Sequence, residues 1–211
     1  MGALLPLDGT RIALLFPAMK TRPVLRRLLL LLPLAAVPLA QAHPGHGPHS
    51  FSAGFVHPLT GYDHLLVMVA VGLWAVQLGG RARWALPLTF VSAMALGAMI
   101  GIAGFALPGV DRWILASVFA LGLLIACAAR LPLGAGLGLV ALAGVFHGLA
   151  HGAEMPLNAN SIHFLTGMVM ATALLHAAGV GLGLAVQKRS VVLLRLAGAG
   201  IVAGGVALCF A

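Results

Sequence analysis

Charged side chains are scarce in this sequence: Asp, Glu, Lys and Arg make up 8% of its 211 residues, whereas about 25% is usual in soluble domains. Hydrophobic residues make up 61%, which is more apolar surface than the core of a soluble domain can hide. The scarcity of charge therefore excludes a soluble globular protein. It predicts an all-α polytopic membrane protein, because a helix satisfies its own backbone polar groups in lipid.

Cysteine and acidic residues are rarer still. The two cysteines, Cys127 and Cys209, lie in separate apolar runs, so we expect no disulfide and two small buried side chains. Four acidic residues against twelve basic ones give a net charge of +8. The basic residues form no patch with interleaved aromatic residues, so nucleic acid is not an expected partner. The phosphate-binding pattern G-x-x-x-x-G-K-[ST] is also absent, which argues against ATP hydrolysis by this chain.

Residues 19–42 have the order of a secretory signal peptide. A basic front precedes the apolar stretch Leu28–Leu39, and Ala40-Gln41-Ala42 follows. Because this apolar stretch is short and contains two prolines, we predict cleavage after Ala42, with an uncleaved anchor helix as the alternative. Residues 1–18 precede a better start at Met19 and are interpreted as an upstream extension that is not part of the protein.

Residues 43–60 are expected to form a histidine-rich periplasmic arm and an entry segment. Cleavage would expose the sequence "HPGHGPHS", in which His43 and His46 are spaced by Gly and Pro. Histidines in such a flexible setting attract transition metals, so both residues are candidates for an additional metal pathway. The alternative is a polar leader to the first membrane helix.

Residues 61–211 contain six apolar stretches, each long enough to cross the hydrocarbon layer as a helix. They are Gly61–Leu78, Trp84–Leu107, Arg112–Ala129, Leu133–His151, Ile162–Val186 and Val191–Phe210. The loops after the first, third and fifth stretches carry Lys or Arg and are therefore expected on the cytoplasmic side. This alternation predicts a multi-pass membrane protein with both mature termini on the outer side of the membrane. The 28 glycines suit close helix packing and are compatible with a homo-oligomer.

Six polar residues are expected to meet at the periplasmic side of this six-helix domain. Three come from the start of the first membrane helix and three from the end of the fourth: His57, Asp63, His64, His147, His151 and Glu154. The last three are spaced i, i+4 and i+7, which places them on one stripe of a helix. Imidazole and carboxylate ligands suit Ni(II), Co(II) or Zn(II). Because ionisable residues are costly in a membrane, we predict a metal-binding site here.

Two further histidines lie on the fifth apolar stretch. His163 is near its start, and His176 is 13 residues further along, or about 20 Å deeper at 1.5 Å per residue. Both are candidates for a metal pathway that leads from the mouth toward the middle of the membrane. The alternative for His176 is a hydrogen bond to the carbonyl group of a neighbouring helix.

These residues resemble two motifs of the HupE/UreJ family of nickel/cobalt permeases. The motif H-x5-D-H is matched by His57, Asp63 and His64. The motif F-H-G-x-[A/V]-H-G-x-E is matched by Phe146, His147, Gly148, Ala150, His151, Gly152 and Glu154. The resemblance covers residues 43–211. It implies a permease, not an enzyme, that carries Ni(II) or Co(II) as cargo and has no prosthetic group. It also implies a supply of metal for hydrogenase, urease or cobalamin.

Two other functions remain open at this stage. The first is an intramembrane metal-dependent hydrolase, although the general-base Glu that zinc proteases place directly after the first His is Gly148 here. The second is a metal-binding accessory protein that transports nothing. We assign no catalytic residues. The choice between nickel, cobalt and zinc stays open, as does whether Glu154 binds the metal or orients a histidine.

Overall fold

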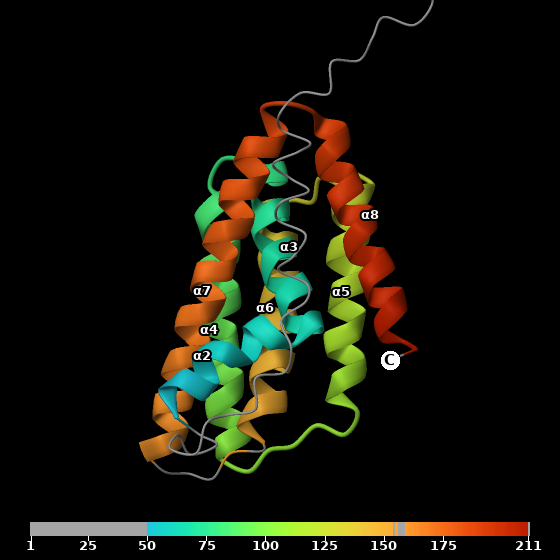
Figure 1. Cartoon of the computed structure of the whole chain (residues 1–211). Coiled ribbons are helices and arrows are strands. Elements are labelled where there is room, and N and C mark those ends of the chain that lie inside the picture. The colour runs from blue at the N-terminus through green and yellow to red at the C-terminus, as the bar shows by residue number, and fades with distance from the viewer. Residues whose placement is uncertain (1–49, 154, 156–158, 211) are drawn as a thin grey trace, which may run out of the picture. The chain divides into compact units, whose positions relative to one another are not determined.

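The computed structural model describes residues 50–153, 155 and 159–210 (Figure 1). This part of the chain is all α-helical and contains no strand. Its helices are α2 (Phe51–Thr60), α3 (Tyr62–Leu78), α4 (Ala82–Ile102), α5 (Val110–Ala126), α6 (Leu133–Gly152), α7 (Ala159–Gln187) and α8 (Val191–Leu208). The predicted upstream extension (residues 1–18), the predicted signal peptide (residues 19–42), His43, His46 and Glu154 lie outside the described residues.

Six of these helices, α3 to α8, correspond to the six apolar stretches. The largest difference is at the end of α4, which stops at Ile102 instead of Leu107. Two glycines follow, Gly104 and Gly109, with positive φ angles of 99° and 70°, and Pro108 lies between them. These residues favour a turn over a continued helix, so α5 begins only at Val110.

Length and apolar composition qualify four helices of the described chain as candidate membrane spans. These are α4, α6, α7 and α8, and the bent pair of α2 and α3 adds a fifth if it is counted as one span. Helix α5 has 17 residues, which is about the shortest length that crosses the hydrocarbon layer.

Helix α3 occupies the centre of the bundle. It contacts α2, α4, α5, α7 and α8, and the stretch from Ala70 to Val76 is buried on all sides. A helix that is apolar around its whole circumference can be surrounded by other helices in this way. The polar residues at its start, Asp63 and His64, are thereby held inside the bundle.

Helix α2 is an element that the sequence did not reveal, because residues 43–60 were interpreted as an arm and entry segment. Ser50 caps its first turn by accepting a hydrogen bond from the Ala53 backbone NH at 3.1 Å. Helices α2 and α3 are bent by 80° across a break of one residue, Gly61, which has an extended backbone. The bend turns α2 across α7 (Figure 1) and lets His57 face the start of α3.

Glycines bring the backbones of neighbouring helices together, as expected from the sequence. A side chain at Gly148 would collide with the Met94 carbonyl of α4, and one at Gly152 would collide with the Ala98 carbonyl. The α2–α7 crossing depends on Gly54 in the same way, since its Cβ would collide with the Phe164 carbonyl. Other glycines have no such role: nothing lies within 4 Å of a Cβ placed at Gly138.

Several basic residues lie at one end of the bundle, whereas Arg112 lies at the start of α5, at the other end. Arg81, after α3, and Arg130, after α5, line the same surface pocket. Arg195, near the start of α8, donates a hydrogen bond to the Ala126 carbonyl of α5 at 2.8 Å.

Cys127 and Cys209 are free, as predicted, but both are exposed. The expectation that they are buried is therefore wrong, because each follows directly on the end of its helix.

Candidate metal site

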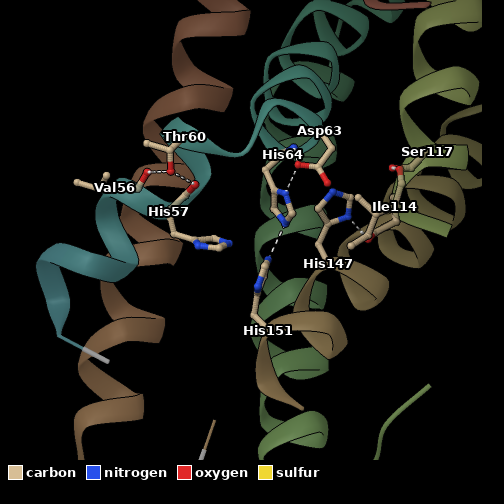
Figure 2. A network of polar contacts seen from close by, with 10 residues as sticks. Val56, His57, Thr60, Asp63, His64, Ile114, Ser117, His147 and His151 are labelled. Atoms are coloured by element: carbon tan, nitrogen blue, oxygen red, sulfur yellow. Dashed lines mark hydrogen bonds and ion pairs between the residues drawn. The ribbon is translucent and has the colours of Figure 1, made fainter. Parts of the chain in front are cut away.

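Three histidines from three helices converge at the end of the bundle opposite Arg81 and Arg130. His57 comes from α2, His64 from α3 and His151 from α6, and one nitrogen of each lies within 4.8 Å of the others. The Nε2 atoms of His64 and His151 are 2.6 Å apart. Figure 2 shows His57 pointing from α2 toward this pair. We call His57, His64 and His151 the outer cluster.

The ring positions within the outer cluster explain how three imidazoles fit in one place. The ring of His57 lies 4.4 Å from that of His151 and 5.5 Å from that of His64, with edge-to-face angles of 77° and 80°. His64 and His151 are buried, with 5% and 9% of their surface exposed. His57 is half-buried. The cluster is therefore largely shielded, which strengthens any electrostatic interaction with an ion.

The separation of the two Nε2 atoms is that of a hydrogen bond. Two nitrogens on one tetrahedral metal are about 3.3 Å apart when each metal–nitrogen distance is about 2.05 Å. His64 and His151 must therefore move apart slightly before they can share an ion.

Asp63 orients His64 within the outer cluster. Its Oδ1 atom accepts hydrogen bonds from His64 Nδ1, at 2.6 Å, and from the His64 backbone NH, at 2.8 Å. An ionised carboxylate only accepts hydrogen bonds, so the proton of this imidazole is on Nδ1 and the lone pair of its Nε2 faces His151. Carboxylates behind metal-ligating histidines fix tautomer and orientation in this way. A Cβ atom at Gly61 would lie 3.2 Å from both Asp63 Oδ1 and His64 Nδ1, which is a tight contact, so glycine at this position leaves room for the hydrogen-bonded pair.

His147 lies next to the outer cluster but is not one of the three converging ligands. Its ring is 4.9 Å from that of His64, and its Nδ1 donates to the Ala143 carbonyl at 2.8 Å. His176 lies elsewhere in the interior, where its Nδ1 donates to the Met68 carbonyl of α3 at 2.7 Å. The expected hydrogen bond to a neighbouring helix is thus present, and the Nε2 atom remains available.

One further sequence candidate is not brought into this cluster, and another lies outside the described residues. His163 is exposed on α7 and is not among the described residues that converge there. Glu154 follows the end of α6 at Gly152 and belongs to the residues that are not described. Of the three ligands expected on one stripe of a helix, the described residues therefore include only His147 and His151.

A cavity of about 440 Å³ leads to the outer cluster. Its walls include His57, His64 and His151, residues of the α4–α5 loop, and two carboxylates, Asp63 and Asp111. Sequence analysis did not propose Asp111, although it is one of three acidic residues after residue 42. Two signals could have identified it: acidic residues are rare in this sequence, and Asp111 lies between the second and third apolar stretches, on the predicted periplasmic side.

The ligand types at this site are those that divalent transition metals prefer. Three neutral imidazole nitrogens with a carboxylate behind one of them suit Ni(II), Co(II) and Zn(II) much better than Mg(II) or Ca(II), which prefer oxygen ligands. The two carboxylates on the cavity wall add negative potential along the approach. The ligand set therefore has the chemistry that holding such an ion requires.

Comparison with known proteins agrees with this chemistry. A family model described as "HupE / UreJ protein" matches residues 29–208. A protein named "Protein HupE" from Rhizobium leguminosarum bv. viciae is 42% identical over 176 residues, which cover 83% of this chain and 92% of that protein. No solved structure matches.

Proposed function

Since the chain belongs to the HupE/UreJ family, we propose that it imports Ni(II) or Co(II) across the bacterial inner membrane. The observation that carries the proposal is the convergence of His57, His64 and His151, with nitrogens within 4.8 Å of one another. A transporter of this kind supplies metal for hydrogenase, urease or cobalamin. It holds no prosthetic group, and the ion is its cargo.

The proposed topology has six spans, with α2 and α3 together forming the first. After cleavage of the signal peptide, the outer cluster and its cavity face the periplasm. The end that carries Arg81 and Arg130 faces the cytoplasm, as the preference of basic loops for that side predicts. Both mature termini are then periplasmic.

The outer cluster would take up the ion by replacing part of its water shell. His57, His64 and His151 act as ligands, and Asp63 holds His64 in the ligating orientation. His147 and then His176 would receive the ion deeper in the bundle. The outer ligands must bind tightly enough to select the ion and weakly enough to release it, as in any permeation pathway.

The membrane potential is a sufficient driving force. A divalent cation gains about 4.6 kcal/mol per 100 mV, which supports an accumulation of more than about a thousandfold. Proton antiport through Asp63 or Glu154 would add to this force. No ATP hydrolysis is required.

The test is uptake by the purified chain in proteoliposomes with an imposed potential, inside negative. We expect accumulation of radioactive Ni(II) above that of empty liposomes, competition by Co(II), and loss of uptake in His64→Ala. His163→Ala is the matched control, because His163 is an exposed histidine outside the cluster. Metal binding without any accumulation would contradict import and favour an accessory role.

A hydrolase is less well supported than a transporter. A metal hydrolase needs a general base beside the metal-bound water. The Oδ1 atom of Asp63 is already occupied by two hydrogen bonds from His64, which suits a positioning role. Turnover of lipid or peptide by the purified chain would reverse this assignment.

A further inference from the structure

Two buried imidazoles beyond the outer cluster each have an unused nitrogen. His147 is fully buried and His176 is 1% exposed. The Nδ1 of each donates to a backbone carbonyl, so Nε2 carries a free lone pair. Neither Nε2 atom has a hydrogen-bond partner among the described residues. An unsatisfied buried polar atom costs about 1–3 kcal/mol, so two of them in one interior indicate a role other than stability.

Both imidazoles lie about one helical turn further into the bundle than the outer cluster. His147 precedes His151 by four residues on α6, and Met68, the hydrogen-bond partner of His176, follows His64 by four residues on α3. Four residues correspond to about 6 Å along a helix axis. Only His147 is in ring contact with the outer cluster, at 4.9 Å from His64.

The side chain of Phe90, on α4, contacts both imidazoles. Its ring centroid lies 5.3 Å from that of His147 and 5.0 Å from that of His176, in both cases edge to face. Phe90 is fully buried. The contacts therefore form a series that runs from the outer cluster to His147, then to Phe90, and then to His176.

The backbone at Phe90 is held in place by close contacts between α4 and α6. A side chain at Gly144 of α6 would collide with the Phe90 carbonyl, and one at Gly148 with the Met94 carbonyl. The backbones of α4 and α6 are thus in direct contact both at Phe90 and one helical turn further along α4, at Met94. A passage between the two imidazoles is opened more readily by rotating the ring than by moving either helix.

We propose that Phe90 is a hydrophobic gate between His147 and His176, and that His176 is the first ligand beyond this gate along the series of contacts that starts at the outer cluster. The Phe90 ring is fully buried and contacts both imidazoles, which corresponds to the closed state of this gate. The inference rests on the proposed import of a divalent metal. An apolar ring at this point excludes water and blocks leakage, and it opens when the ion passes from one Nε2 atom to the other.

The test uses Phe90→Leu in the full chain, reconstituted in proteoliposomes with Co(II) as the probe. Phe119→Leu is the matched control, because Phe119 is a bundle phenylalanine on α5 that faces Gly205 of α8. We expect Phe90→Leu to raise Co(II) flux about tenfold, the change for a barrier lower by about 1.4 kcal/mol. The equilibrium affinity for Co(II), set by the outer cluster, should not change. Adding His176→Gln to Phe90→Leu should abolish the increase.

A second readout does not depend on transport. Diethyl pyrocarbonate modifies accessible imidazoles, and mass spectrometry locates the modified residue. His176 should be modified faster in Phe90→Leu than in the wild type or in Phe119→Leu. If Phe90→Leu does not fold, Phe90→Ile serves for both measurements.

The outcomes separate the gate from the transport function. Suppose that the wild type transports Co(II) and that Phe90→Leu has the same flux and the same rate of His176 modification as the wild type. This result would overturn the gate and leave the transport function intact. No wild-type flux, together with faster modification of His176 in the variant, would overturn the transport function and leave the barrier at Phe90. A loss of Co(II) affinity in Phe90→Leu would show that the ring only supports the outer cluster, which also overturns the gate.

Discussion

One short motif on α6 supplies residues to two faces of this helix, and the two faces differ in what packs against them. His147 and His151 face the interior, where imidazoles from other helices meet them. Gly148 and Gly152, each one residue further on, face α4 so closely that a methyl group would collide with its backbone. The comparison teaches that the motif combines a ligand face with a packing face. The packing face determines how accurately the ligand face is placed.

The largest effect is expected on the packing face. Gly148→Leu should destabilise the folded chain by about 3 kcal/mol or more, because α4 and α6 have to separate. Gly138→Leu on the same helix should change stability by less than about 0.5 kcal/mol, since its Cβ would meet open space. Size-exclusion profiles and thermal unfolding in detergent measure both variants. Equal stability of the two would refute the distinction between them.

The next effect is expected on the ligand face. His151→Ala should weaken Co(II) binding by more than about a hundredfold, which exceeds the 10–100-fold range typical of residues behind a ligand. It should leave the unfolding temperature close to that of the wild type. His163→Ala should bind Co(II) normally. The visible absorption of bound Co(II) follows the titration, and an unchanged affinity in His151→Ala would remove this residue from the ligand set.

A smaller loss should follow from Asp63→Asn, which keeps the size of the side chain. The amide cannot reproduce a charged acceptor for His64 Nδ1, so the imidazole loses its fixed tautomer. Co(II) affinity should fall by about 10–100-fold. Asp63→Glu keeps the charge and should recover part of the affinity. If Asn and Glu behaved alike, the orienting role of Asp63 would not hold.

The smallest effect is expected at Asp111, on the wall of the cavity. Asp111→Asn should lower the rate of Co(II) uptake about two- to threefold at low ionic strength and leave equilibrium affinity unchanged. Because salt screens exposed charges, the difference should vanish at about 1 M salt. A difference that persists at high salt would indicate a direct ligand instead of long-range attraction.

Much of this architecture could be predicted from residues alone. The scarcity of charge and the length of the apolar stretches predicted an all-helical membrane protein, and α3 to α8 lie where those stretches lie. The two histidine motifs and the alternation of basic loops predicted that six residues would meet at one end of the bundle, among them His57, His64 and His151. Their nitrogens do converge.

Other features could not be predicted, because they depend on contacts between distant segments. Helix α2 looked like part of an arm, since a ten-residue helix is marginal by itself and is held by its crossing with α7 at Gly54. Asp111 gave no motif, and its place on the cavity wall follows from the path of the α4–α5 loop. Phe90 is one of nine phenylalanines, and nothing in its neighbours along the chain marks it.

The sequence by itself determined the class of the protein, the helices α3 to α8 and the chemistry of its candidate ligands. Composition and periodicity are local properties, and they decide whether a segment can lie in lipid and which groups it presents. Only the tertiary structure decided which groups meet. The 80° bend at Gly61 and the glycine contacts between α4 and α6 bring His57, His64 and His151 together and place Phe90 against two imidazoles. Such distances follow from helix packing, which depends on the complementarity of whole surfaces.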